Sequence, residues 1–168
     1  MKPPRLLVVS AGLLLCAAAV AQQKLPWQKN DGPANEPPQS VNYLYPEQVT
    51  LTAGKPGTVE MHFRVKDGLH INSHTPLEKS FIRTELIVAE PSGVNVSAVD
   101  FPPGTTFTPA FSPDDKLSVY TGDFVLTAHI TAKPGEHLIQ AALRYQACDS
   151  NSCYPPRKAP VALDIIAK

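Results

Sequence analysis

The sequence lacks the features of several large classes of protein. Its 15 basic and 15 acidic residues cancel to a net charge of zero, and the absence of a basic block argues against nucleic acid or an anionic membrane as a partner. No amphipathic helix and no internal repeat can be recognised. After the apolar run at residues 6–20, no second run approaches the ~20 residues of a membrane helix. The 168 residues are enough for one domain with a substantial core.

The N-terminus has the pattern of a secretory signal peptide. A basic start and the apolar run 6–20 end in Ala19-Val20-Ala21, which has the small residues of a cleavage site. We expect residues 1–21 to be removed and the protein to be periplasmic or secreted. A lipoprotein would instead use Cys16, but the bulky Leu15 stands before it where a small residue is expected.

The part that remains divides into a leader and one domain. Residues 22–40 are rich in proline, asparagine and glutamine, which predicts a flexible leader. Residues 41–168 are expected to form an all-β domain, because apolar and polar residues alternate in short runs separated by glycine and proline. The clearest strand is 58–66, and further strands are expected at 50–52, 69–72, 85–89, 94–99, 124–131, 138–148 and 160–166. Short strands at regular spacing predict an antiparallel β-sandwich.

One segment, 102–115, is expected to be a long irregular loop. Loops of this length within a compact domain are usually functional or mobile. The segment contains Phe107 and Phe111, which either cover a site or pack into the core.

Two cysteines, Cys148 and Cys153, remain after signal cleavage and form an even pair in an oxidising compartment. The pair is either a fixed structural staple or a disulfide that opens and closes. A bridge across so short a loop contributes only about 2 kcal/mol to stability, at the low end of the usual range. The spacing therefore allows a redox role without requiring it.

The residues around the pair resemble the N-terminal periplasmic domain of the DsbD thiol–disulfide interchange family. The resemblance covers residues 41–166, and its most specific part is Tyr145-Gln146-Ala147-Cys148 followed by Cys153-Tyr154-Pro155-Pro156. The segments 66–74 and 159–163 also match. The four residues between the cysteines are one fewer than in the best-known member of the family. The resemblance includes neither the transmembrane part nor the thioredoxin-like part of the full-length family proteins.

The resemblance implies an immunoglobulin-like antiparallel β-sandwich with the two cysteines on adjacent strands at one end. Family members take electrons from a membrane-embedded partner through a thioredoxin-like domain and reduce periplasmic disulfide proteins. The residues alone leave the order of reaction open; the resemblance implies that Cys153 attacks or is attacked and that Cys148 resolves. A loop with an aromatic tip caps the disulfide in the family. Here that loop would be residues 107–115, with Phe111 at its tip.

Two residues before the middle of the domain, His70 and Asn72, lie where the family places polar or aromatic side chains beside the disulfide. His70 would assist proton transfer during exchange, or it is a strand histidine with no such role. Tyr145 and Tyr154 flank the cysteine pair and either shield it or simply pack. His70, His74 and Cys148 are residue types that bind metals, but their spacing matches no metal template, so neither a metal nor a cofactor is expected.

The residue after the first cysteine, Asp149, should raise the pKa of a neighbouring thiol, because a carboxylate disfavours a thiolate nearby. A slow thiol of this kind suits an electron carrier better than a strong oxidant.

The sequence thus supports two functional hypotheses. In the first, the domain is a periplasmic module of a protein-disulfide oxidoreductase pathway. It passes reducing equivalents through Cys148 and Cys153 to or from a thioredoxin-like domain or a membrane electron transporter, with periplasmic disulfide proteins as acceptors. In the second, it is a secreted β-sandwich binding module whose disulfide is purely structural.

Overall fold

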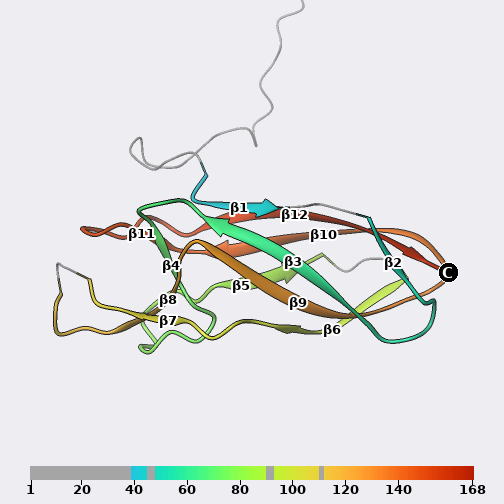
Figure 1. Cartoon of the computed structure of the whole chain (residues 1–168), viewed down its shortest axis with the longest axis horizontal. Helices are drawn as coiled ribbons and strands as arrows, with labels where there is room; N and C mark the ends of the chain where they lie inside the picture. The colour runs from blue at the N-terminus through green and yellow to red at the C-terminus, as the bar shows by residue number, and fades with distance from the viewer. Residues whose placement is uncertain (1–38, 45–47, 90–92, 110–111) are drawn as a thin grey trace, which may run out of the picture. The chain divides into compact units, whose positions relative to one another are not determined.

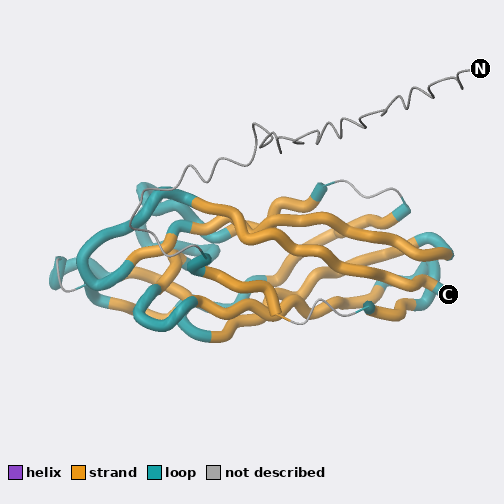
Figure 2. The backbone as a smooth tube through the Cα atoms, turned by 90° about the horizontal axis from the view of Figure 1, so that it is seen from above, coloured by secondary structure: helices purple, strands orange, loops and turns teal. Residues whose placement is uncertain are grey.

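The computed structural model describes residues 39–44, 48–89, 93–109 and 112–168. These residues form strands and loops without a helix (Figure 2), which confirms the predicted all-β class. Accordingly, no helix in these ranges has the length and apolar character needed to cross a membrane. The expected signal peptide, nearly all of the expected leader, and Phe111 lie outside the described residues.

Two four-stranded sheets form the sandwich (Figure 1). In spatial order, sheet A consists of β1 (Val41–Leu44), β3 (Gly57–Val65), β9 (Asp123–Ala132) and β6 (Val94–Asp100). Sheet B consists of β2 (Val49–Leu51), β12 (Arg157–Ala167), β10 (Gly135–Tyr145) and β5 (Glu85–Val88). Neighbouring strands are antiparallel, as predicted, except for β2 and β12, which run parallel.

The core lies between the inward faces of sheets A and B. Alternate residues of the long strands are buried, as expected for strands with one face against a partner sheet. On β3 the alternation matches the sequence prediction. The buried residues of these strands include Val59, Met61, Phe63 and Val65 on β3, Leu126, Ala128 and Ile130 on β9, Ile139 and Leu143 on β10, and Val161, Leu163 and Ile165 on β12.

A third sheet, sheet C, lies at the end of the domain away from the C-terminus (Figure 1). Its strands, in spatial order, are β11 (Ala147–Cys148), β4 (His70–Asn72), β8 (Leu117–Tyr120) and β7 (Thr105–Phe107). The expected strand 138–148 is therefore two strands, β10 and β11. The prediction that 102–115 is irregular throughout is wrong, because β7 lies within it and pairs with β8.

Two strands of sheet C, β4 and β11, are buried on both faces. Ile71, Tyr120 and Ala147 belong to the main core. The intervening residues point to the other face, because successive residues of a strand alternate in direction. We call this second face the cysteine face; its buried members, which lie outside the main core, are Cys148, His70, Asn72, Val119 and Leu117. The sulfur chemistry is thus separated from the main core by one sheet.

A row of aromatic rings joins the main core to sheet C. Its members are Tyr43, Phe63, Phe124 and Tyr120, whose successive ring centroids lie 5.4, 5.3 and 4.9 Å apart. The hydroxyl of Tyr120 donates a hydrogen bond of 2.8 Å to the carbonyl of Pro102 and accepts one of 3.1 Å from the backbone N–H of His74. The row therefore fixes the start of the segment that leads into β7.

Candidate disulfide site

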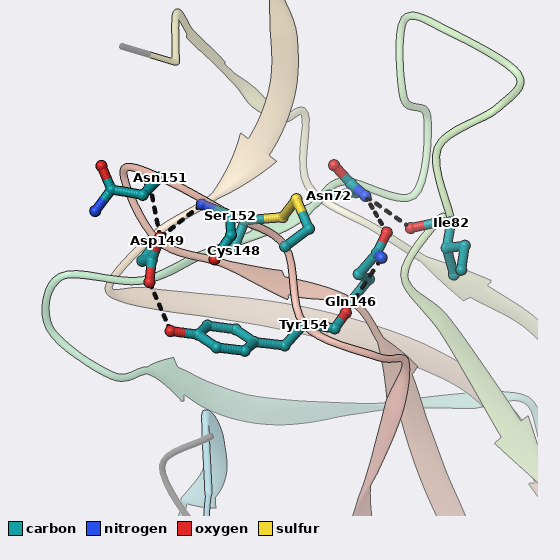
Figure 3. Close-up of a disulfide and its surroundings, with 9 residues drawn as sticks. Asn72, Ile82, Gln146, Cys148, Asp149, Asn151, Ser152 and Tyr154 are labelled. Atoms are coloured by element: carbon teal, nitrogen blue, oxygen red, sulfur yellow. Dashed lines mark hydrogen bonds between the residues drawn. A yellow bond between two sulfur atoms is a disulfide. The ribbon is translucent and has the colours of Figure 1, made fainter. Parts of the chain in front are cut away.

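Cys148 and Cys153 form a disulfide in the loop between β11 and β12 (Figure 3). The two sulfurs are 2.00 Å apart and the two Cα atoms 3.9 Å apart, and the two residues also pair as an isolated antiparallel bridge. The bond therefore joins neighbouring segments of one hairpin loop rather than distant parts of the fold. Opening it releases only this loop.

The two cysteines differ in their exposure to solvent. Cys148 is 0% exposed, whereas Cys153 is an exposed residue. This difference follows from the fold, because Cys148 ends β11 on the cysteine face while Cys153 lies beyond the turn. Of the two cysteines, only Cys153 is therefore open to solvent.

The carboxylate of Asp149 organises the loop between the cysteines. It accepts hydrogen bonds from the backbone N–H groups of Asn151 (2.7 Å) and Ser152 (2.8 Å) and from the hydroxyl of Tyr154 (2.6 Å), as Figure 3 shows. These bonds, that of Tyr154 first, lower the pKa of the Asp149 carboxyl below its usual value. The carboxylate stays ionised until the pH falls below the ordinary range of aspartate, so the bonds that shape the loop persist at neutral and mildly acidic pH.

A chain of side-chain amides connects the loop to β4 (Figure 3). Gln146 donates to the carbonyl of Tyr154 (3.2 Å), and Nδ2 of Asn72 donates both to Oε1 of Gln146 (3.4 Å) and to the carbonyl of Ile82 (3.1 Å). Asn72 and Tyr154 are thus both tied to the disulfide loop. Tyr145 is 2% exposed and packs in the main core.

His70 lies on the cysteine face, directly opposite Cys148 in the pairing of β4 with β11. It is 3% exposed, and its Nε2 atom has no hydrogen-bond partner. Burial lowers the pKa of His70 below its ordinary value, and the nearby carboxylate of Asp149 opposes that shift. The structure therefore places His70 opposite Cys148 and ties Asn72 to Gln146, two residues before Cys148.

The aromatic ring that covers this part of the site belongs to Phe107. Its centroid is 4.2 Å from that of the His70 imidazole. Phe107, His70 and Ser150 of the disulfide loop also line one open pocket of about 410 Å³. Phe111, which the resemblance suggested as the tip of the cap, lies outside the described residues.

Two contributions to the site were missed from the sequence. Asp149 was considered only for its effect on the thiols, although an aspartate followed by Ser-Asn-Ser is a typical signal for a turn closed by the side chain. Phe107 was recognised as an aromatic of a long segment but not as the ring over His70, because that contact depends on the pairing of β7 with β8.

Metal-binding side chains do not gather at the site. In the described ranges, no group of three or more His, Cys, Asp or Glu residues is placed to hold a metal ion. His74, considered with His70 from the sequence, has its Nδ1 2.9 Å from the carbonyl of Thr84 and its ring stacked on Phe101. His74 therefore serves the packing next to sheet C.

Comparison with protein families identifies the domain. The family model described as the N-terminal domain of the thiol:disulfide interchange protein DsbD matches residues 40–165. The chain belongs to this family. The match includes both cysteines, His70, Asn72 and Phe107, and membership confirms the immunoglobulin-like antiparallel sandwich that the resemblance implied. No curated protein sequence is significantly similar to the chain.

Two solved structures are similar to this DsbD N-terminal family member. The DsbD N-terminal domain of Neisseria meningitidis, in the reduced form, is 19% identical, with 66% of this chain and 79% of that chain covered and a TM-score of 0.40. The N-terminal periplasmic domain of ScsB from Proteus mirabilis is 10% identical, with 74% and 43% covered and a TM-score of 0.46. Membership of the DsbD N-terminal family rests on the match over residues 40–165.

Proposed function

We propose that the domain carries reducing equivalents between thioredoxin-like proteins and other periplasmic disulfide proteins by opening and closing the Cys148–Cys153 disulfide. The observation that carries this proposal is the arrangement of an exposed Cys153 bonded to a buried Cys148, in a chain of the DsbD N-terminal family. A bond of this kind is accessible from one side, and its breakage leaves the sandwich intact. Both properties are needed in a carrier.

The exchange proceeds in two displacements. A thiolate of the partner attacks Sγ of Cys153, a new intermolecular disulfide forms, and Cys148 leaves with the electron pair of the broken bond. The second thiol of the partner then displaces Cys153. The ionised Asp149 lies next to Cys148 and disfavours a lasting thiolate there, so the dithiol form retains its protons until it meets an oxidised acceptor.

Phe107 has the position of a cap in this proposal. It lies over His70, which faces Cys148, and it belongs to β7, the edge strand of sheet C. An edge strand is held on one side only, so Phe107 can move away from the site without breaking the pairing of β4 with β8. We therefore assign to Phe107 the shielding role that the resemblance gave to Phe111.

A redox titration tests the function. The purified domain is equilibrated with buffers of defined thiol–disulfide potential, and the fraction of closed Cys148–Cys153 bond is read by alkylation and mass spectrometry. We expect a midpoint above about −300 mV, within the range of thioredoxin-like proteins. A midpoint below about −300 mV would instead support the structural staple of a secreted binding module.

Export is a separate part of the proposal. We assign residues 1–21 to a signal peptide, 22–40 to a flexible leader and 41–168 to the domain, which places the domain in the periplasm. The chain is expressed with its native N-terminus in a Gram-negative host, and the periplasmic fraction is analysed by intact mass. We expect a protein that begins at Gln22; retention of residues 1–21, or a lipid-modified Cys16, would contradict the assignment.

A further inference from the structure

One buried nitrogen atom of the domain is left without a hydrogen bond. Among the buried side-chain nitrogen and oxygen atoms of the described ranges, Nε2 of His70 alone has no partner. A buried polar atom without a partner costs folding free energy, and native structures keep few such atoms. The missing hydrogen bond of this buried Nε2 atom therefore indicates a chemical role for His70.

The imidazole of His70 lies beside the disulfide. His70 and Cys148 are directly opposite each other in the antiparallel pair of β4 and β11. Side chains paired in this way project from the same face, with Cβ atoms about 4.5–5.5 Å apart. Both residues are buried, and the ring of Phe107 covers the imidazole at a centroid distance of 4.2 Å. The imidazole thus projects from the same face of sheet C as the Cys148 side chain and, at 3% exposed, has almost no contact with bulk water.

Three charged side chains surround this position. Asp149 follows Cys148, and its carboxylate favours the protonated form of His70. Lys66 and Asp67, in the turn before β4, line the pocket that His70 also lines. Burial is the stronger influence and lowers the pKa of His70, so the imidazole is mostly neutral at pH 7 in the disulfide form. A neutral imidazole has one N–H and one lone pair, and it can accept or give a proton.

We propose that His70 delivers a proton from Nε2 to the sulfur of Cys148 when a partner opens the disulfide, and takes that proton back when the disulfide re-forms. This inference rests on the proposed function, because it assigns a proton pathway to the same exchange. It names the acid and the base for the buried leaving sulfur, Cys148, which bulk water does not reach.

The partner thiolate forms a bond to Sγ of Cys153, the Cys148–Cys153 bond breaks, and its electron pair stays on Cys148. His70, protonated from solvent before the attack, gives its Nε2 proton to that sulfur and is left neutral, the form that its burial favours at rest. The second thiol of the partner then displaces Cys153, and the proton of that thiol goes to the Cys153 sulfur, so the domain has gained two electrons and two protons. This step also explains why Nε2 of His70 has no hydrogen-bond partner in the disulfide form: its partner would be the Cys148 thiol, which exists only in the dithiol form.

The pH dependence of disulfide opening tests this step. The rate of opening by dithiothreitol is measured from about pH 8 to about pH 5 and divided by the concentration of dithiothreitol thiolate. For the unmodified domain we expect this corrected rate constant to rise as the pH falls, because protonated His70 assists departure of Cys148. In His70→Phe, which keeps a ring against Phe107, it should be independent of pH and about tenfold lower at the acidic end.

Two variants serve as controls. His129→Gln removes a histidine that lies 2.6 Å from Asp100 on sheet A, and it should keep the profile of the unmodified domain. Asp149→Asn removes the carboxylate that favours protonated His70, so the rise should move to lower pH. If His70→Phe shows the same pH profile as the unmodified domain, the proton pathway is wrong.

A measurement on the unmodified domain covers the case in which His70→Phe does not fold. The His70 ring is titrated by NMR in the disulfide form, and its pKa must coincide with the inflection of the corrected rate. Disagreement between the two would overturn the proposal. A potential below about −300 mV would reject the carrier function itself, whereas complete but pH-independent opening of the disulfide would reject only the role of His70.

Discussion

The variant Cys148→Ser should accumulate as a covalent complex with a thioredoxin-like protein. It keeps Cys153, the exposed cysteine of the pair, as a free thiol. That thiol can attack the disulfide of an oxidised partner, but the resolving sulfur that would release the partner is gone. We expect most of the variant to be found as a mixed disulfide on a non-reducing gel, while turnover falls to background.

The matched variant Cys153→Ser should behave differently. It keeps only Cys148, which is 0% exposed and lies on the cysteine face of sheet C. A buried thiol beside the carboxylate of Asp149 is a poor nucleophile, so the yield of mixed disulfide should be at least about tenfold lower. A variant with both cysteines replaced by serine gives the background level of mixed disulfide. Equal trapping by the two single variants would contradict the proposal that Cys153 reacts with the partner and Cys148 resolves. No trapping by either variant would argue for a structural disulfide.

A second large effect is expected in the core, from Phe63→Ala. Phe63 is 0% exposed and is the second ring of the aromatic row, in contact with Tyr43 and Phe124. Loss of a buried phenylalanine side chain removes apolar burial and leaves a cavity, which typically costs about 3–5 kcal/mol. For a domain of this size, the melting temperature should fall by roughly 10–15 °C, measured by circular dichroism on the disulfide form.

Phe63→Leu is the control for that experiment. Leucine fills more of the space than alanine, so its cost should be clearly smaller if the cavity is the cause. A loss below about 1 kcal/mol for Phe63→Ala would mean that the neighbouring rings close the space, contrary to the close packing expected of protein interiors.

The long strands could be predicted from the sequence because one buried face imposes a period of two. This signal is clear on β3, and on β9, β10 and β12 it identified the strands even where their ends differ. The short strands β1, β7 and β8 were not predicted. Strands of three or four residues contain few alternations, so they are recognised only where turn residues mark their ends, as for β2, β4 and β5. By contrast, β7 consists of Thr-Thr-Phe within a proline-rich segment. Its pairing is decided by tertiary contacts.

The parallel pair of β2 with β12 was also not expected. It involves only Val49–Leu51 beside Ile165–Ala167, so the short β2 docks along the end of a strand that is already paired with β10. The direction of so short a strand depends on where the preceding chain enters the sheet, and no residue pattern within the strand records it.

The sequence predicted those features of the site that depend on the type of residue. It did not predict the features that depend on which strands pair with one another. The cysteines, His70 and Asn72 were named from the sequence; the structure places Cys148, His70 and Asn72 on sheet C, with Cys153 bonded to Cys148. The difference in exposure between Cys148 and Cys153 and the contact of Phe107 with His70 were not foreseen. Both arise from the order of strands in sheet C, which joins segments more than thirty residues apart in sequence.

The two-faced burial of sheet C has a consequence for the evolvability of the domain. On β4 the main core receives Ile71, while the neighbours His70 and Asn72 turn toward the sulfurs. Substitutions at His70 or Asn72 therefore change side chains that lie outside the main core, while Ile71 and the rest of that core keep their own set of residues. During evolution, substitutions on the cysteine face can therefore change the reduction potential, the proton delivery and the choice of acceptor. The residues on the core face of the sheet can meanwhile stay the same and hold the sandwich together.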